Sequence, residues 1–146
     1  MGKIRIYLDN CCFNRPYDDQ EQKKILLETE AKLSIQQGIK NGEFELVWSY
    51  MLDFENSNNP NEIISSAISK WKTLCCCDII ESEQLLRNAQ AITEYGIDSK
   101  DAIHIASAIE GTAQYFFTTD NDIIKRRNYI KEIKILNPVQ FFTEAE

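Results

Sequence analysis

Four acidic residues have the type and placement that a metal-dependent reaction needs: Asp9, Glu55, Asp101 and Asp120. Each lies at or just past the end of an apolar stretch, or on the first turns of a segment whose pattern predicts a helix. Carboxylates repel one another, so a fold that gathers four of them needs a cation to offset the cost. Carboxylate oxygens suit Mg²⁺ or Mn²⁺, and these ions suit phosphate chemistry. Together the four acids predict a divalent-metal site that acts on phosphate esters.

Taken singly, each acid also has a simpler structural explanation. An acid on the first turn of a helix is favoured by the helix dipole. An Asp that follows a strand often caps the next helix, and Asp120 or Asp122 could do so here. The interpretation as a metal site therefore depends on all four side chains meeting at one point.

Five short apolar segments, rich in β-branched and aromatic residues, predict the strands that would position these acids. They cover residues 3–8, 44–49, 75–80, 114–119 and 133–136. Asp9 follows the first strand and Asp120 follows the fourth.

Helical segments are predicted between the strands, after a loop at residues 10–18. The first runs from residue 18 or 19 to about 40, and a short second helix carries Glu55. The third starts from a cap at Asn59 with Pro60 in the first turn, and the fourth runs from a cap at Ser82 to Gly96. The last two run from a cap at Ser99 to about 110 and from 121 to about 129. Apolar residues at helical spacing should face the core, among them Leu27, Ala31, Ile35, Ile63, Ile64, Ala67, Ile68, Trp71, Leu85, Leu86, Ala89 and Ile92.

The alternation of strand and helix predicts an α/β fold with a mostly parallel sheet covered by helices. In such a sheet ligands bind beyond the carboxyl ends of the strands, where Asp9 and Asp120 would lie. The helix starting near Asp101 is about 15 Å long and runs back along a strand of roughly 17 Å, so Asp101 should lie near Asp120. Glu55 follows Ser49 by six residues, on the helix that leaves the second strand. The topology thus predicts that all four acids share one edge of the sheet.

With 146 residues, 43% of them hydrophobic, the chain is expected to form one domain over residues 1–146 with a sizeable core. Its longest apolar runs are only a few residues, which is too short to span a bilayer. The first residues alternate in polarity and lack the apolar region of a signal peptide. The protein is therefore expected in the cytoplasm.

The overall charge is acidic, with a net charge of −7 and a pI near 4.8. Taken alone, this argues against a general nucleic-acid binder. A polyanionic substrate would have to be met by local cations and by bound metal.

Five cysteines fall in two runs, Cys11-Cys12 and Cys75–Cys77. An odd number in adjacent positions is not a disulfide framework, and neither run has zinc spacing. Because His104 is the single histidine, a site built from His and Cys is hard to assemble. The cysteines are interpreted as reduced thiols that pack as small apolar groups.

Four motifs occur in order along nearly the whole chain. They are residues 6–10 (Ile-Tyr-Leu-Asp-Asn), Ser49 with Glu55 six residues later, residues 100–108 (Lys-Asp-Ala-Ile-His-Ile-Ala-Ser-Ala) and residues 117–122 (Phe-Thr-Thr-Asp-Asn-Asp). With these motifs the chain resembles the PIN-domain family of metal-dependent ribonucleases. The resemblance implies a three-layer α/β/α sandwich around a five-stranded parallel sheet, and hydrolysis of phosphodiester bonds in single-stranded RNA with Mg²⁺ or Mn²⁺.

The resemblance also implies site residues, position by position. The catalytic, metal-binding acids would be Asp9, Glu55, Asp101 and Asp120, and Asp122 takes a place that is acidic in some members. Thr118 or Thr119 would contact a metal-bound water or the phosphate. Asn10 stands where members often carry Ser or Thr, so the contribution of the first loop to substrate binding departs from the pattern.

The partners implied by the resemblance are an RNA strand, a second copy of the chain in a homodimer and, for the toxin members of the family, an antitoxin protein. Other members act alone, and the motifs do not separate the two groups.

Under this interpretation Asp9 and Asp101 bind one or two ions directly, while Glu55 and Asp120 bind through water or orient the attacking nucleophile. His104 lies three residues after Asp101, on an adjoining helix face. Two roles remain open for it: a second-shell hydrogen bond to a metal-binding carboxylate, or a buried histidine satisfied by the backbone.

Candidate cations for holding RNA are Arg15, in the loop after Asp9, and the run 125–127 (Lys-Arg-Arg). A cationic run late in a helix also suits the helix dipole, which makes Arg15 the better candidate. Phe13 and Tyr17 could stack on bases, although aromatic residues near a strand end more often belong to the core.

Two other functions remain in competition. A phosphatase or phosphotransferase on a similar sheet often needs a second acid two residues after the first, but Cys11 stands there and no Gly-rich phosphate loop is present. A catalytically silent scaffold could bind RNA or a partner protein through an inherited groove. Retention of all four acids argues against that scaffold.

Overall fold

The computed structural model describes residues 3–144 and has the α/β class that the sequence predicts. Five strands form one sheet in the order β3-β2-β1-β4-β5, and each neighbouring pair is parallel. The strands are β1 (Ile4–Leu8), β2 (Phe44–Ser49), β3 (Cys75–Ile79), β4 (Tyr115–Phe117) and β5 (Lys134–Leu136). All five lie within the segments predicted from the sequence.

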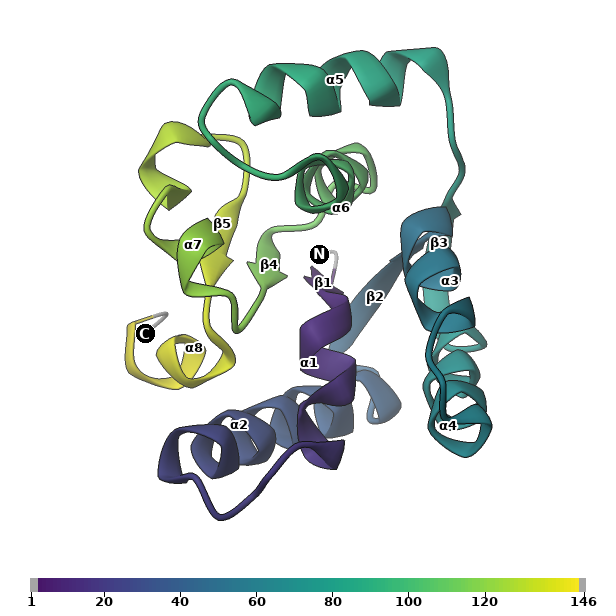
Figure 1. Cartoon of the computed structure of the whole chain (residues 1–146), viewed down its shortest axis with the longest axis vertical. Coiled ribbons are helices and arrows are strands. Elements are labelled where there is room, and N and C mark those ends of the chain that lie inside the picture. The colour runs from purple at the N-terminus through teal and green to yellow at the C-terminus, as the bar shows by residue number, and fades with distance from the viewer. Residues whose placement is uncertain (1–2, 145–146) are drawn as a thin grey trace.

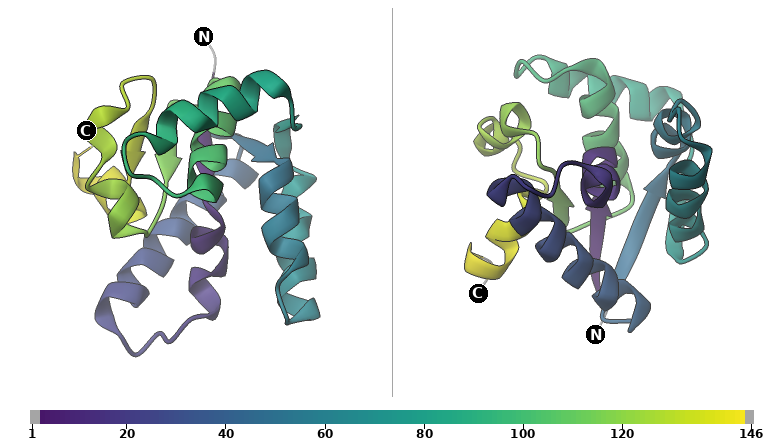
Figure 2. Two further views of the ribbon diagram at one scale, coloured as in Figure 1. Left: turned by 45° about the horizontal axis from the view of Figure 1, so that its top comes forward. Right: turned by 60° about the horizontal axis from the view of Figure 1, so that its bottom comes forward.

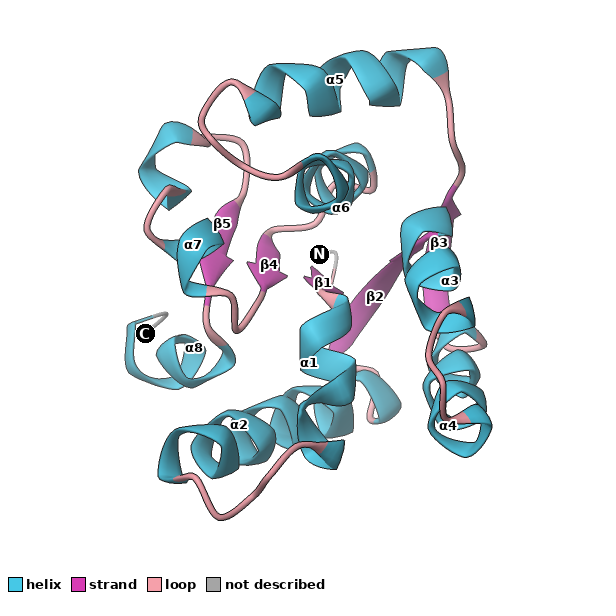
Figure 3. Ribbon diagram, viewed as in Figure 1, coloured by secondary structure: helices cyan, strands magenta, loops and turns pink. Residues whose placement is uncertain are grey.

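Helices cover both faces of this sheet, as Figures 1 and 2 show. Helices α5 (Glu83–Thr93) and α6 (Ser99–Glu110) pack together on one face, while α2 (Lys23–Lys40) and α8 (Pro138–Glu144) pack together on the other. The remaining helical elements, drawn in Figure 3, are α1 (Asn10–Asn14), α3 (Tyr50–Ser57), α4 (Glu62–Lys72), α7 (Asn121–Ile124) and the 3₁₀ turns η1 (Arg15–Tyr17) and η2 (Arg127–Tyr129). No helix within residues 3–144 has both the length and the apolar character that crossing a membrane requires.

Side-chain caps determine where two helices near the sheet edge begin. Oγ of Ser49 accepts a hydrogen bond from the backbone N–H of Leu52 at the start of α3. Oγ of Ser82 accepts one from Leu85 at the start of α5, as the sequence predicts. These caps fix the rotation at which each helix presents its later residues.

Two predicted caps are wrong. Asn59 uses its side-chain oxygen to accept from the N–H of Asn61 in a turn, and Asn61 in turn caps α4, which begins at Glu62. Ser99 is the first residue of α6, and Asp98 holds the capping position without a side-chain hydrogen bond.

The segment after β1 is helical rather than the loop predicted at residues 10–18. Asp9 caps α1 by accepting a hydrogen bond from the N–H of Asn10. Pro16 then stands in η1, where its missing N–H is tolerated, and the long helix α2 begins only at Lys23. The helix predicted over residues 121–129 is divided into α7 and η2, and α8 has no counterpart in the prediction.

The core is centred on β1 and its neighbours. Ile6, Tyr7 and Leu8 are completely buried, which is expected for the middle strand of a parallel sheet covered on both faces. The ring of Tyr7 stacks on that of Phe116, with ring centroids 5.3 Å apart. Because β1 is packed from all sides, the residue that follows it is held in a defined position.

Three residues predicted to face the core are exposed instead: Leu27 (44%), Ile63 (83%) and Leu86 (41%). In α2 the next residue, Glu28, is the buried one, because its carboxylate pairs with the guanidinium of Arg15 at 3.2 Å. Glu28, paired with Arg15, therefore faces inward in this turn of α2, where the hydrophobic pattern predicted that Leu27 would do so.

All five cysteines are free thiols, as the sequence predicts. Cys12 is buried, where it packs as a small apolar group, whereas Cys76 is exposed on β3, at the edge of the sheet.

Candidate metal centre

The carboxylate of Asp9 is held rigidly where β1 ends. Its side chain is 7% exposed. Oδ1 accepts a hydrogen bond from the N–H of Asn10 at 2.8 Å, and Oδ2 accepts one from the hydroxyl of Thr118 at 2.9 Å. Thr118 immediately follows β4, so two neighbouring strands of the sheet fix this one carboxylate.

Glu55 reaches the same place from α3. The cap at Ser49 starts this helix at the carboxyl end of β2, and the side chain of Glu55 is 25% exposed. Its Oε1 makes a direct contact with Nε2 of His104. Glu55 is thus the more solvent-accessible of the two carboxylates around this histidine.

His104 joins Asp9 and Glu55 from α6. Its side chain is completely buried, and Nε2 also lies 3.8 Å from Oδ1 of Asp9. Among residues 3–144, Asp9, Glu55 and His104 are the group whose potential ligand atoms all lie within 4.8 Å of one another. Two carboxylates and one imidazole within this distance form a donor set that fits a divalent cation.

The other ring nitrogen of His104 is fixed from inside the core. Nδ1 lies 2.5 Å from the hydroxyl of Tyr7, which lies 2.7 Å from Oγ of Ser49. Burial raises the pKa of Tyr7 well above its usual value, and the hydrogen bond to Ser49 only partly opposes this. Tyr7 therefore acts as a neutral hydroxyl that orients the imidazole.

The electrostatics of His104 follow from these contacts. Burial lowers its pKa, but the hydrogen bond to Glu55 and the negative charges of Asp9, Glu55 and Asp101 act in the opposite direction, and the net shift is upward. The pocket stabilises positive charge on or beside this ring.

Asp101 lies one helical turn before His104 on α6 and interacts electrostatically with Asp9 and His104. Burial and the charges of Asp9 and Asp120 together raise the pKa of its carboxyl to about 7, with His104 partly opposing the shift. A carboxylate destabilised by other carboxylates is the electrostatic sign of acids crowded at one point.

Asp120 and Asp122 lie beside Asp101. All three line a cavity of about 340 Å³, together with Asp98 and Arg126. Asp120 also caps α7 by accepting a hydrogen bond from the N–H of Asp122, so the structural role considered for it is realised. The four predicted acids therefore come to one edge of the sheet, with Asp9 and Glu55 in the tight cluster and Asp101 and Asp120 beside it.

The remaining predicted residues surround this edge in different ways. Thr118 is buried and orients Asp9, whereas Oγ1 of Thr119 accepts a hydrogen bond from Arg15 at 2.7 Å. Arg15 also pairs with Asp18 and with Glu28. Its guanidinium is thus engaged by three side chains of the protein itself.

Tyr7 is the site residue that sequence reasoning missed. It precedes Asp9 by two positions in a strand that reads as ordinary core, and its partner His104 is 97 residues away. A polar hydroxyl in the middle of a buried strand was the available signal, because such a group must find a partner.

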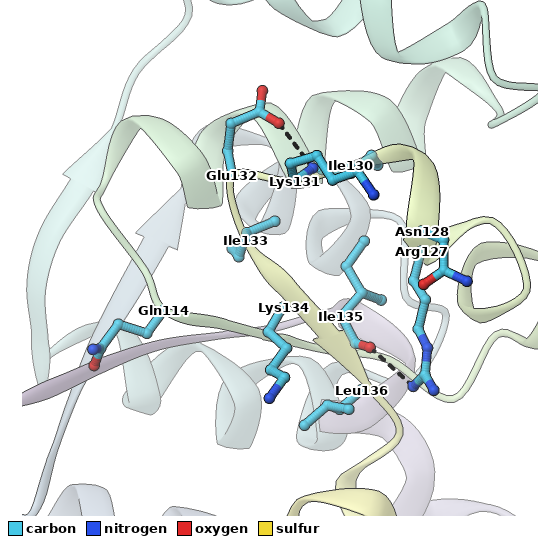
Figure 4. A pocket seen from close by; sticks show the side chains of 10 residues that line it. All are labelled: Gln114, Arg127, Asn128, Ile130, Lys131, Glu132, Ile133, Lys134, Ile135 and Leu136. Atoms are coloured by element: carbon cyan, nitrogen blue, oxygen red, sulfur yellow. Dashed lines mark hydrogen bonds between the residues drawn. The ribbon is translucent and has the colours of Figure 1, made fainter. Parts of the chain in front are cut away.

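A cavity of about 710 Å³ lies elsewhere, along β5. It is lined by Gln114, Arg127, Asn128 and residues 130–136 (Figure 4). In it, Nη1 of Arg127 donates to the carbonyl oxygen of Ile135, and the backbone N–H of Lys131 donates to the side chain of Glu132. None of the clustered acids lines this cavity.

Comparison with known proteins gives a likeness in structure but not in sequence. No family model matches the chain, and no curated protein matches it. The fold is similar to that of a chain in the crystal structure of VapBC2 from Rickettsia felis bound to a DNA fragment from its promoter, with a TM-score of 0.55 and 13% sequence identity. The match covers 92% of this chain and 98% of that chain. At this identity the likeness establishes the fold and is consistent with a PIN-like sheet.

Proposed function

We propose that this chain is a PIN-like, metal-dependent endoribonuclease that hydrolyses phosphodiester bonds of single-stranded RNA. The observation that carries the proposal is the meeting of Asp9, Glu55, His104 and Asp101 at the carboxyl ends of the strands, with Asp120 lining the adjoining cavity. Carboxylates that crowd in a partly buried pocket repel one another, and a bound cation offsets that cost.

The donor set fits Mg²⁺ or Mn²⁺. Asp9 and Asp101 would hold the ion directly, while Glu55 and Asp120 would hold it through water or orient the attacking water. A bound divalent ion supplies a water of lowered pKa and offsets the charge that develops on the phosphate. Asp122, on the rim of the same cavity, extends this acidic surface.

The protein's own groups would position the chemistry. Thr118 holds the Asp9 carboxylate in one orientation, so that an oxygen faces the cluster. Arg126 lines the same cavity as Asp101 and Asp120 and offers a cation for a substrate phosphate. Asn10 directly follows Asp9, and Thr119 directly precedes Asp120, so these two residues are the proposed contacts for the RNA backbone.

The direct test is incubation of purified protein with single-stranded RNA and Mn²⁺, with and without EDTA. We expect cleavage that EDTA abolishes and that Asp9→Asn removes while the variant stays folded. Glu30→Gln, an exposed acid on α2, is the matched control and should cleave normally. Cleavage at the parental rate by Asp9→Asn would refute the mechanism.

The cellular role proposed on the fold likeness is that of the toxin in a toxin–antitoxin pair, acting in the cytoplasm as a homodimer. Production of the chain alone should then arrest growth, and production of Asp9→Asn should not. Normal growth with the wild-type chain would refute the toxin role and leave the nuclease chemistry to be judged by the RNA assay.

A catalytically silent scaffold remains the second candidate, because Asp9 and Asp120 each cap a helix and thus have a structural use. Thermal unfolding with millimolar Mn²⁺ separates the two functions. A cation that binds the folded chain alone raises the unfolding temperature. The scaffold should show neither this rise nor EDTA-sensitive cleavage.

A further inference from the structure

A buried chain of hydrogen bonds ends at the candidate metal centre. It runs from Oγ of Ser49 to the hydroxyl of Tyr7 at 2.7 Å, and from there to Nδ1 of His104 at 2.5 Å. All three residues are completely buried, and they come from the end of β2, where Ser49 caps α3, from β1 and from α6. The imidazole is thus fixed in place by three elements of the fold.

With Nδ1 of His104 paired to Tyr7, Nε2 is the ring nitrogen that can contact the site. Nε2 points toward the acids, where it contacts Oε1 of Glu55 and lies 3.8 Å from Oδ1 of Asp9. A histidine needed only for packing would not require its free nitrogen to face two carboxylates. The fixed orientation is that of a metal-ligating imidazole whose other nitrogen has a protein partner.

The hydroxyls behind the ring can serve either tautomer. With the proton on Nε2, that group donates to Glu55, Tyr7 donates to Nδ1, and Ser49 donates to Tyr7. With the proton on Nδ1, the ring donates to Tyr7, Tyr7 donates to Ser49, and the lone pair of Nε2 faces the acids. Both arrangements carry the same number of protons. They differ in which ring nitrogen holds one of them and in the rotation of two hydroxyl groups, and in each the Tyr7 hydroxyl both donates and accepts a hydrogen bond.

We propose that Nε2 of His104 is a direct ligand of the ion held beside Asp9 and Glu55, and that this nitrogen makes the site prefer Mn²⁺ or a later transition ion over Mg²⁺. The inference rests on the proposed function only in requiring that a divalent ion binds here. Mg²⁺ takes oxygen ligands, whereas imidazole suits the transition ions. His104 is then a metal ligand rather than a group acting behind the carboxylates.

Because His104 is the single histidine of the chain, one isotope label reports on it alone. The untagged protein is prepared with ¹⁵N-histidine and with unlabelled histidine, loaded with one equivalent of Mn²⁺, and compared by pulsed electron paramagnetic resonance. We expect a nitrogen coupling to the manganese that changes with the isotope. Bound Mn²⁺ whose spectrum is identical in the two samples overturns the role of His104 but leaves the nuclease proposal intact. Failure to bind Mn²⁺ at all overturns both.

A second measurement uses Tyr7→Phe, which removes only the hydroxyl that orients the ring. We expect roughly 10- to 100-fold weaker Mn²⁺ binding by calorimetry, with much less change for Mg²⁺. The matched control is Tyr50→Phe, because the hydroxyl of Tyr50 is buried without a hydrogen-bond partner in the described chain. Equal losses for both ions in Tyr7→Phe would indicate a general structural effect and would contradict a nitrogen ligand.

Discussion

The hydroxyl of Thr118 donates a hydrogen bond to Oδ2 of Asp9 at 2.9 Å, so the residue after β4 orients the carboxylate that follows β1. Oγ1 of Thr118 also accepts a hydrogen bond from the N–H of Asp120 at 3.1 Å. One buried hydroxyl therefore connects two of the predicted metal-binding acids.

Replacing this hydroxyl should disturb the metal centre more than the fold. In Thr118→Val the Asp9 carboxylate loses a donor, and we expect metal affinity to fall about 10- to 100-fold. Stability should fall by about 1–3 kcal/mol, because the N–H of Asp120 loses its acceptor. Calorimetric Mn²⁺ titration and urea unfolding measure the two effects. Thr118→Ser keeps the hydroxyl and is the control; equal Mn²⁺ affinity in all three proteins would contradict this role.

An exposed aromatic–cation pair flanks the acids on the side of α3. Nζ of Lys100 lies 5.4 Å from the ring centroid of Phe54, whose exposure is 48%, and these residues immediately precede Asp101 and Glu55. If RNA crosses this edge, a base can stack on Phe54, and Phe54→Ala should weaken RNA binding by about 1–3 kcal/mol.

Fluorescence anisotropy with labelled RNA, in an Asp9→Asn background that keeps the RNA intact, measures this change. Phe142→Ala removes a ring of similar exposure, 47%, from α8 and should bind RNA normally. Identical losses in the two variants would mean that Phe54 has no special place on the substrate path.

Arg15 stabilises the fold through Glu28. Their ion pair measures 3.2 Å, and the side chain of Glu28 is only 2% exposed. Arg15→Ala leaves a buried carboxylate without its cation, which should cost about 3–5 kcal/mol in urea unfolding. In the double variant Arg15→Ala/Glu28→Gln, part of this loss should be recovered, since no charge is stranded. Unchanged stability in Arg15→Ala, combined with weaker RNA binding, would instead support the substrate contact considered from the sequence.

Lys32 gives the protein a pH-dependent weakness. Burial lowers the pKa of this lysine to about 8, below its ordinary value of 10.5. The folded chain then releases the proton before the unfolded chain does, so stability should rise as pH increases from about 8 to 10.5. At pH 7, where the amine is charged in both states, Lys32→Met should be more stable, with an upper limit of roughly 3 kcal/mol.

Chemical unfolding of wild type and Lys32→Met across this pH range tests the sign. The difference between them should shrink as pH approaches 10. Lys40→Met is the control. Nζ of Lys40 lies 5.2 Å from the ring centroid of Trp71, much as Nζ of Lys32 lies 5.7 Å from that of Phe13, but Lys40 is exposed. A constant difference at all pH values would show that the gain comes from packing rather than from the charge.

The sheet and the convergence of the acids were predictable because they follow from strong, general constraints. A buried parallel strand is a short apolar run, and the residue after it must lie at the ligand-binding edge. This logic placed Asp9 and Asp120 at the ends of their strands, and the antiparallel course of α6 brought Asp101 toward them.

The details around the site were not predictable because they depend on contacts between distant segments. The cap of α4 moved from Asn59 to Asn61 through a local competition between two asparagines. The inward position of Glu28 depends on Arg15, and the orientation of His104 depends on Tyr7 in another element. Hydrophobic periodicity carries no information about such polar pairs.

The acids come from successive parts of the chain, with Asp9 near its beginning and both Thr118 and Asp120 after β4. A nascent polypeptide that ends before β4 lacks Thr118, which orients the Asp9 carboxylate. It also lacks Asp120, which lines the cavity beside Asp101. The proposed metal site is therefore incomplete during synthesis until residues 115–146 have docked, and a fragment ending before residue 115 should bind Mn²⁺ more weakly than the whole chain.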